Sequence, residues 1–294
     1  MHRGIIIKGV GGFYYVKEGD AEYQCRARGL FKKEGITPCV GDRVEFSLDL
    51  KTSEGLIENI LPRKTFLIRP CIANVDTALI VMSVKDPKPN LMFLDRLMIK
   101  VAGAGLETLI CFNKIDLDPD KNYLEYTMDY ERAGYKVVYT SVKTGWGIDE
   151  LMDGLKESIT VLAGPSGVGK SSILNQMIPG LKLKVRGTSK KIGRGRHTTR
   201  HTQLFQLPNG GMVADTPGFT SLDLKDISSQ QLSDLYREFE PFKGKCRFSS
   251  CLHATEPGCS VRHAMGSNKI SRQRYERYLS LLKEIKETEA STYD

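Results

Sequence analysis

The chain has 294 residues, of which 40% are hydrophobic and 27% charged, with 43 lysines and arginines against 35 acidic residues. These proportions are typical of globular proteins and exclude a fibrous repeat or a wholly disordered chain. No stretch approaches the roughly 18 consecutive apolar residues that span a bilayer. The N-terminal segment also lacks the apolar core of a signal peptide, so we expect a cytoplasmic protein with no membrane partner.

Residues 1–65 have the pattern of short β-strands separated by turn residues. Valine, isoleucine and aromatic side chains dominate them, and helical periodicity is absent. About five strands in about 60 residues suit a small barrel of the oligonucleotide-binding (OB) type. The strands alone leave open whether such a barrel binds RNA or only serves as a docking module. Residues 61–70, which include Pro62 and Pro70, have the composition of a linker.

Residues 66–222 change to apolar strands that alternate with helices. This pattern predicts a parallel sheet covered on both faces, an α/β domain whose ligands bind where the strands end. The predicted strands include residues 77–84, 108–112, 136–140 and 159–163, and the predicted helices are 91–105, 123–134 and 148–158.

A phosphate-binding loop follows the strand at 159–163. Residues 164–172, GPSGVGKSS, match GxxxxGK[ST] between a strand and a helix. Backbone N–H groups would surround the phosphates, Lys170 would add a positive charge and Ser171 would offer its hydroxyl to Mg²⁺. A purely structural glycine turn is the alternative. The candidate nucleotide-binding residues here are Gly164, Pro165, Ser166, Gly167, Val168, Gly169, Lys170, Ser171 and Ser172.

Two further loops predict guanine recognition. Residues 113–116 read NKID, and the Asp116 carboxylate can accept hydrogen bonds from both N–H groups of the guanine edge, which adenine cannot supply. A solvated turn in which Asp116 caps a helix is the alternative. The segment SVK follows the strand at 136–140 and is similar to the loop that supports the guanine oxygen. The candidates are Asn113, Lys114, Asp116, Ser141, Val142 and Lys143.

The switch candidates lie in and after a basic segment, since residues 181–206 contain 8 basic and no acidic residues. Asp215 and Gly218 form a DxxG element after a predicted strand, where Asp215 would hold Mg²⁺ through water and the Gly218 N–H would reach the γ-phosphate. Thr198 or Thr199 is the expected Mg²⁺ and γ-phosphate sensor, with Thr199 preferred. Ordinary loop hydrogen bonding is the alternative role for both threonines.

The order of these motifs is cyclically shifted. The base-reading loops at 113 and 141 precede the phosphate loop at 164, whereas ordinary GTPases begin with the phosphate loop. Because chain termini often lie close together at a domain surface, such a permutation can preserve the fold. The permuted order connects DxxG directly to residues 223–294, so we expect loss of the γ-phosphate to act on that domain first.

Residues 223–294 are predicted to be helical and to bind a metal. Three thiolates and one imidazole within fourteen residues suit a closed tetrahedral Zn²⁺ site with a structural role. His263 is a weaker competitor for the imidazole position, and reduced cysteines without metal are the alternative. The odd total of 7 cysteines argues against a disulfide framework, and the other four are expected to be small core residues. The metal candidates are Cys246, Cys251, His253 and Cys259.

NKID, GPSGVGKSS, GRGRHTTRH, DTPGF and the cysteine spacing, in this order, resemble the RsgA (YjeQ/YloQ) family of circularly permuted GTPases along the whole chain. The resemblance implies an OB-type barrel (1–65), a permuted P-loop GTPase domain (66–222) and a helical zinc-binding domain (223–294). It also implies late maturation of the small (30S) ribosomal subunit, GTP hydrolysis stimulated by that subunit, and contacts of the barrel and zinc domain with ribosomal RNA. We expect GTP or GDP, Mg²⁺ and one structural Zn²⁺ as ligands, a monomer, and no DNA partner.

Hydrolysis without a subunit is expected to be slow. Phe219 follows DxxG where many GTPases place the glutamine that orients the attacking water. His197 is a candidate for that role, and the alternatives are that it contacts RNA or caps its loop, and that the ribosome supplies the missing group. Two other functions stay open at this point: an RNA-binding module with GTP only as a ligand, and an ATPase or small-molecule kinase with a coincidental NKxD.

Overall fold

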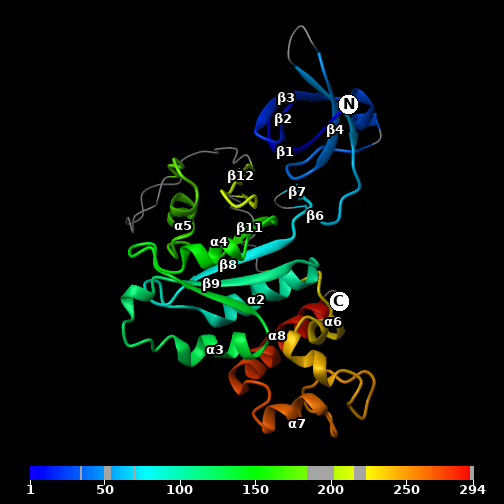
Figure 1. Ribbon diagram of the computed structural model, residues 1–294. Coiled ribbons are helices and arrows are strands. Elements are labelled where there is room, and N and C mark those ends of the chain that lie inside the picture. Colours follow the sequence, from blue (N-terminus) through cyan, green and yellow to red (C-terminus); the bar gives the residue numbers. More distant parts are fainter. Residues whose placement is uncertain (34, 50–53, 69–70, 184–201, 215–222, 292–294) are drawn as a thin grey trace.

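The structure is a computed structural model that describes residues 1–33, 35–49, 54–68, 71–183, 202–214 and 223–291 (Figure 1). Its N-terminal part is a closed five-stranded barrel, as predicted, in the order β1-β2-β3-β5-β4. Val16, Phe46 and Ile57 fill its centre and are fully buried. The barrel elements are β1 (His2–Val10), β2 (Phe13–Glu18), β3 (Ala21–Ala27), α1 (Gly29–Lys33), β4 (Arg43–Leu48) and β5 (Gly55–Ile60).

The segment predicted as a linker contributes instead to a small packed hairpin. Strands β6 (Phe66–Leu67) and β7 (Ile72–Ala73) pair antiparallel, and Ile72 forms a bridge with Val40 of the barrel. Ile72 is fully buried and belongs to the same apolar core as the central sheet. The connection between barrel and sheet is therefore a folded element rather than a free spacer.

The central domain is a six-stranded sheet in the order β10-β9-β8-β11-β13-β12, parallel except for the edge strand β12. It confirms the predicted α/β domain, and in Figure 1 it lies between the barrel and the C-terminal helices. The strands are β8 (Thr77–Ser83), β9 (Glu107–Asn113), β10 (Lys136–Thr140), β11 (Ile159–Ala163), β12 (Leu204–Gln206) and β13 (Met212–Ala214).

Alternate residues of the strands face two separate apolar cores. In β8, Ile80 and Met82 join the core covered by α2 (Leu91–Gly103) and α3 (Leu124–Arg132). Leu79 and Val81 join the core covered by α4 (Ile148–Asp153) and α5 (Lys170–Met177). A 3-10 turn, η1 (Ile115–Leu117), follows β9. Both faces of the sheet are thus covered, which explains why its central strands are almost continuously apolar.

The C-terminal part is helical, and no strand occurs among the described residues 223–291. Helix α6 ends at Asp234, and a 3-10 helix that contains Pro241 follows it. Ile99 of α2 packs in the same apolar core as Tyr278 and Leu282. The elements are α6 (Ser229–Asp234), η2 (Arg237–Phe242), α7 (Ser260–Gly266) and α8 (Arg272–Ser291).

Two of the cysteines differ from the prediction. Cys25 and Cys111 are buried thiols, as expected, but Cys39 and Cys71 form a disulfide with Cα atoms 6.0 Å apart. Their separation of 32 residues hid the pairing from the sequence. The disulfide can form because the parallel β-bridge between Val40 and Ile72 places the two residues before them, Cys39 and Cys71, side by side.

Among the described residues, every helix is too short or too polar to cross a bilayer.

Candidate functional site

The predicted nucleotide-binding loops lie at one edge of the sheet. Strand β9 pairs with β10 on one side and β8 on the other, and β8 pairs with β11. Because these four strands are parallel, the loops that follow them meet at their carboxyl ends. The sheet therefore brings residues 113–116, 141–143 and 164–172 together, although the chain passes through them in permuted order.

The phosphate loop depends on a glycine at its last turn. Gly169 has φ +102, and a Cβ added there would lie 2.4 Å from Nδ2 of Asn113. Any other residue would be strained by the backbone and would collide with that amide. Lys170 Nζ donates to the carbonyl oxygens of Gly164 at 2.8 Å and Pro165 at 2.6 Å, so its charge lies within the loop that would surround a phosphate.

Asn113 joins the base-reading loop to the phosphate loop. Its Nδ2 donates to the Val168 carbonyl oxygen at 2.8 Å, and its Oδ1 accepts from Thr140 Oγ1 at 3.1 Å. Asn113 is 1% exposed and Thr140 is fully buried, so this bond network has little competition from water. Thr140 was not predicted, because a threonine at the end of a strand gives no signal of a positioning role.

Asp116 and Lys114 are fixed by the neighbouring loops. Ser141 Oγ donates to Asp116 Oδ1 at 2.6 Å, and this hydrogen bond holds the carboxylate in one orientation. Lys114 has a left-handed backbone (φ 66), and its Nζ donates to the Gly167 carbonyl oxygen at 2.8 Å and to that of Asp86. The lysine stem thus connects the base-reading loop to the phosphate loop a second time. Asp86 was also missed, since its contact uses a backbone oxygen.

The SVK segment lies beside the base-reading carboxylate, and its predicted support of a guanine oxygen stays a prediction. The Ser141 N–H donates to the carbonyl oxygen of Trp146 at 3.0 Å, and the Ser141 side chain contacts Asp116. Val142 packs against the core beneath α4 and α5, while Lys143 is exposed. The switch candidates His197, Thr198, Thr199, Asp215 and Gly218 lie outside the described residues.

The four predicted metal ligands form one cluster. One ligand atom from each of Cys246, Cys251, His253 and Cys259 lies within 4.8 Å of all the others. His253 Nδ1 is 3.6 Å from Cys246 Sγ and 3.4 Å from Cys259 Sγ. Tetrahedral Zn–S bonds of about 2.3 Å would place two sulfurs about 3.8 Å apart, and Cys246 Sγ and Cys259 Sγ lie 4.0 Å apart, so the spacing fits such an ion. His263 is not in the cluster.

The surroundings of the cluster favour a neutral imidazole and hold the ligand loop in place. Burial lowers the pKa of His253, which keeps the imidazole neutral and its lone pair available. Cys259 Sγ accepts from the Arg262 N–H at the start of α7. Tyr275 and Tyr278 donate to the carbonyl oxygens of His253 and Leu252, both at 2.6 Å, and thereby hold the ligand loop against α8.

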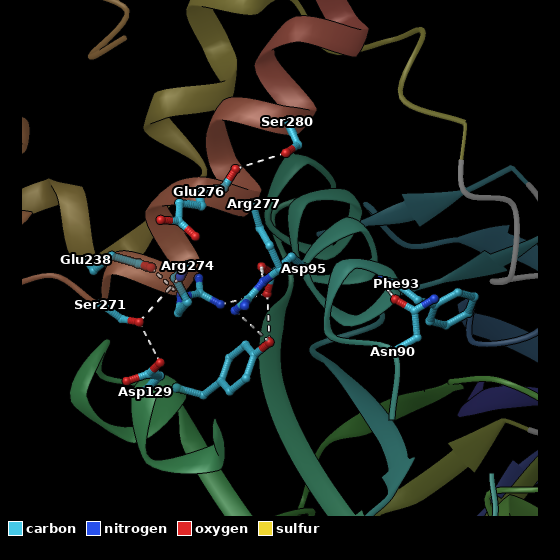
Figure 2. Close-up of polar contacts among 11 residues, drawn as sticks. Asn90, Phe93, Asp95, Asp129, Glu238, Ser271, Arg274, Glu276, Arg277 and Ser280 are labelled. Carbon is cyan, nitrogen blue, oxygen red and sulfur yellow. Dashed lines mark hydrogen bonds and ion pairs between the residues drawn. The ribbon is translucent and has the colours of Figure 1, made fainter. Parts of the chain in front are cut away.

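A buried charge cluster, defined by Asp95, Glu238, Arg274 and Arg277, fixes the C-terminal domain to the central domain (Figure 2). Arg274 Nη1 donates to Asp95 Oδ1 at 2.8 Å, and Arg277 Nε donates to Asp95 Oδ2 at 2.5 Å. Arg274 also donates to Glu238. The side chains of Asp95 and Arg274 are 1% and 3% exposed.

Arg274 keeps its positive charge despite its burial. Burial by itself would lower the pKa of Arg274, but the carboxylates of Asp95 and Glu238 outweigh that effect and raise it. Tyr130 of α3 also donates to Asp95, at 2.9 Å. The cluster therefore joins α2 and α3, which follow the loops beside the base-reading site, to α8 of the C-terminal domain. Polar residues in a helix usually face water, so no pattern in the sequence indicated this charge cluster.

Comparison with known proteins agrees with this architecture. The family model described as RsgA GTPase matches residues 60–225, and that described as RsgA N-terminal domain matches residues 3–57. Relatives from Alkaliphilus metalliredigens and Ruminiclostridium cellulolyticum, both named "Small ribosomal subunit biogenesis GTPase RsgA", are 43% and 47% identical. The alignments cover 97% and 98% of this chain and 98% and 95% of the relatives.

Two solved structures share the whole fold. YjeQ from Thermotoga maritima is 37% identical with a TM-score of 0.84, over 97% of this chain and 98% of that one. YloQ, described as a circularly permuted GTPase, is 36% identical with a TM-score of 0.82, over 98% of this chain and 96% of that one. The chain thus belongs to the RsgA GTPase family, as its motifs predicted, and it is a GTP-hydrolysing enzyme.

Proposed function

We propose that this RsgA-family GTPase acts as a GTP-driven switch in late maturation of the small ribosomal subunit. In this proposal the chain divides into an RNA-binding barrel (1–65), a permuted GTPase domain (66–222) and a zinc-binding domain (223–294). The barrel and the zinc-binding domain contact ribosomal RNA, and the protein acts as a cytoplasmic monomer. The names of its relatives support the subunit as its partner.

The observation that carries the nucleotide assignment is the hydrogen bond from Asn113 to the Val168 carbonyl oxygen. It supports one continuous site in which Asp116 accepts from the guanine edge and Lys170 neutralises phosphate charge. Discrimination against adenine follows, because an adenine N1 acceptor would face a carboxylate and leave that charge without a donor.

The ligands proposed are GTP or GDP with Mg²⁺, and one structural Zn²⁺. Ser171, Asp215 and Thr198 or Thr199 would hold Mg²⁺, which supplies charge neutralisation at the β- and γ-phosphates when bound. Cys246, Cys251, His253 and Cys259 would hold Zn²⁺. Four protein ligands leave no open position, so this metal would stabilise the fold rather than take part in hydrolysis.

Guanine specificity is tested by nucleotide competition. We expect fluorescent GDP to be displaced by GTP but not by ATP, and Asp116→Asn to lose this preference. Asp120→Asn is the matched control, since Asp120 is exposed and lies four residues further along the same loop. Tight ATP binding, or unchanged guanine preference in Asp116→Asn, would support an ATPase or kinase instead.

Substitution of His197 tests which group orients the attacking water. We propose that His197 orients the attacking water when the subunit is bound, which would make turnover slow alone and fast with subunits. His197→Ala should then lose most of the stimulated turnover while its GTP affinity is unchanged. Full stimulation in His197→Ala would assign the role to a group of the ribosome.

Subunit binding is tested by co-sedimentation with small ribosomal subunits in GDP, GTP and a non-hydrolysable GTP analogue, at two salt concentrations. We expect the analogue to give the strongest binding and higher salt to weaken it, because RNA contacts release counterions. Nucleotide-independent binding without multiple-turnover hydrolysis would indicate an RNA-binding module in which GTP is only a ligand.

A further inference from the structure

The barrel and the GTPase domain meet where a barrel loop, residues 37–42, packs against the hairpin segment, residues 63–75. We call this region the barrel junction. The Ala73 N–H donates to the Val40 carbonyl oxygen at 2.9 Å, and Asn74 Nδ2 donates to the Gly41 carbonyl oxygen at 2.9 Å. A Cβ at Gly41 would lie 2.1 Å from the Ala73 carbonyl oxygen, so the two segments touch backbone to backbone.

An ion pair closes the barrel junction on its other side. Arg63 donates to both carboxylate oxygens of Asp42, at 2.7 and 2.8 Å, and Asp42 is fully buried. The Asp42 carboxylate also accepts from the Cys39 N–H at 2.7 Å. These contacts hold the two segments together without any covalent bond, so the junction has a folded arrangement whether or not Cys39 and Cys71 are joined.

The cysteines of the chain fall into classes of different reactivity. Burial raises the pKa of Cys25 to about 11 and that of Cys111 to about 12, so both are protonated and shielded thiols. Three others belong to the metal cluster. Cys71 is exposed and its partner Cys39 is buried beside it. An exposed thiol with a second thiol at disulfide distance is the arrangement of a reversible redox pair.

We propose that Cys39 and Cys71 form a reversible thiol-oxidation site that fixes the barrel to the GTPase domain, with a low-molecular-weight disulfide as its oxidant. Proteins in reducing compartments that carry such pairs usually use them transiently. The oxidised state described by the structure would lock the barrel junction, and the reduced state would keep only its non-covalent contacts.

The chemistry balances as two exchange steps. The Cys71 thiolate attacks one sulfur of the small disulfide, which forms a mixed disulfide and releases one small thiolate. The Cys39 thiolate then attacks the Cys71 sulfur, forms the Cys39–Cys71 bond and releases the second small thiolate. Two protein thiols are oxidised, one small disulfide is reduced to two thiols, and the two protein protons pass to solvent or to the released thiolates.

The effect of the Cys39–Cys71 bond on function rests on the proposed action of the protein on the small ribosomal subunit. Locking the barrel junction limits the angles that the barrel can adopt relative to the nucleotide site. The cysteines lie outside the loops that bind nucleotide, so intrinsic hydrolysis is unaffected. Docking of both the barrel and the GTPase domain onto one ribosomal particle needs a particular angle between the two domains. The affinity for that particle therefore differs between the oxidised and the reduced protein.

The test uses the full chain, loaded with metal, equilibrated in buffers of reduced and oxidised glutathione. Digestion without reductant followed by mass spectrometry should recover a Cys39–Cys71 linked peptide at oxidising ratios and lose it at reducing ones. Cys71→Ser is the matched variant, because an exposed serine leaves the core unchanged, and Cys39→Ala is a second variant. No linked peptide, or linkage of either cysteine to a different one, overturns the proposal.

Amide hydrogen exchange shows whether the bond acts on the barrel junction. We expect residues 37–42 and 71–75 to exchange at least tenfold more slowly in oxidised than in reduced protein, with no such difference in Cys71→Ser. Equal exchange in both states overturns the locking role. Intrinsic GTP turnover should agree within twofold. Loss of subunit stimulation in every form would contradict the proposed function, while the peptide and exchange results would still decide on the redox site.

Discussion

The two ends of the GTPase domain are joined to their neighbours by different chemistry. At the barrel junction one partly exposed arginine, Arg63, pairs with one buried carboxylate, and a disulfide closes the contact. At the C-terminal end Arg274 and Arg277 share Asp95 in a nearly dry interior (Figure 2). Shared buried charges fix one geometry, since any shift leaves a charge without its partner. The C-terminal domain is therefore held rigidly, whereas the barrel junction has a bond that can open.

The C-terminal domain is connected to the nucleotide domain in two ways. The direct chain connection after DxxG predicts that loss of the γ-phosphate acts on the C-terminal domain first. The charge cluster adds a second connection, which runs through α2 and α3 from the base-reading side of the site. The C-terminal domain thus contacts the half of the nucleotide domain that reads the base.

Removing the metal should produce the largest effect, which is the loss of folded structure in the C-terminal domain. A chelator should unfold residues 223–291, because four-ligand structural zinc contributes on the order of 10 kcal/mol to folding. The measurement is hydrogen exchange with and without chelator. The barrel strands serve as the internal control and should keep their protection. Unchanged protection around residues 246–259 would show that metal does not stabilise this domain.

Asp95→Ala should have the next largest effect. It removes the acceptor that Arg274 and Arg277 share. Arg274 keeps Glu238 as a partner, but Arg277 loses its carboxylate, and breaking such a buried pair costs about 3–5 kcal/mol. Urea unfolding of the variant measures this loss. Arg96→Ala is the matched control, because it breaks a pair with Glu284 that is partly exposed and should cost less than about 1 kcal/mol. Equal losses in both variants would mean that the charge cluster has no special role.

Arg63→Ala should have the smallest effect on stability, and that effect should be confined to the barrel junction. Asp42 is fully buried but keeps the Cys39 N–H as a donor, and water can reach the site of the partly exposed Arg63 side chain, so we expect a loss of about 2–3 kcal/mol. Faster hydrogen exchange of residues 37–42 should accompany it, with the central sheet unchanged. Arg28→Ala, which breaks an exposed pair with Glu58 on the barrel itself, is the control. A loss as large as that of Asp95→Ala would contradict the difference between the two junctions.

The features that the sequence predicts well are those with local patterns. Strands of the sheet appear as apolar runs, the phosphate loop as spaced glycines before Lys170, and the metal cluster as four ligands within fourteen residues. The features that it misses depend on residues far apart in the chain. Asp95 and Arg274 are 179 residues apart, and each has the pattern of a solvated helix position. Thr140 and the Cys39–Cys71 pair likewise acquire their partners only through tertiary contacts.

The space at Gly169 has a practical consequence for experiments on this enzyme. Because the amide of Asn113 occupies the position of a side chain there, one added methyl group would push apart the two halves of the nucleotide site. Gly169→Ala would thus disrupt the nucleotide site, through the displaced Asn113 amide, without removing any charged or hydrogen-bonding side chain. The variant would not bind nucleotide, while its barrel and C-terminal domain lie away from the substitution. It is therefore suited to measuring what those two domains bind in the absence of nucleotide.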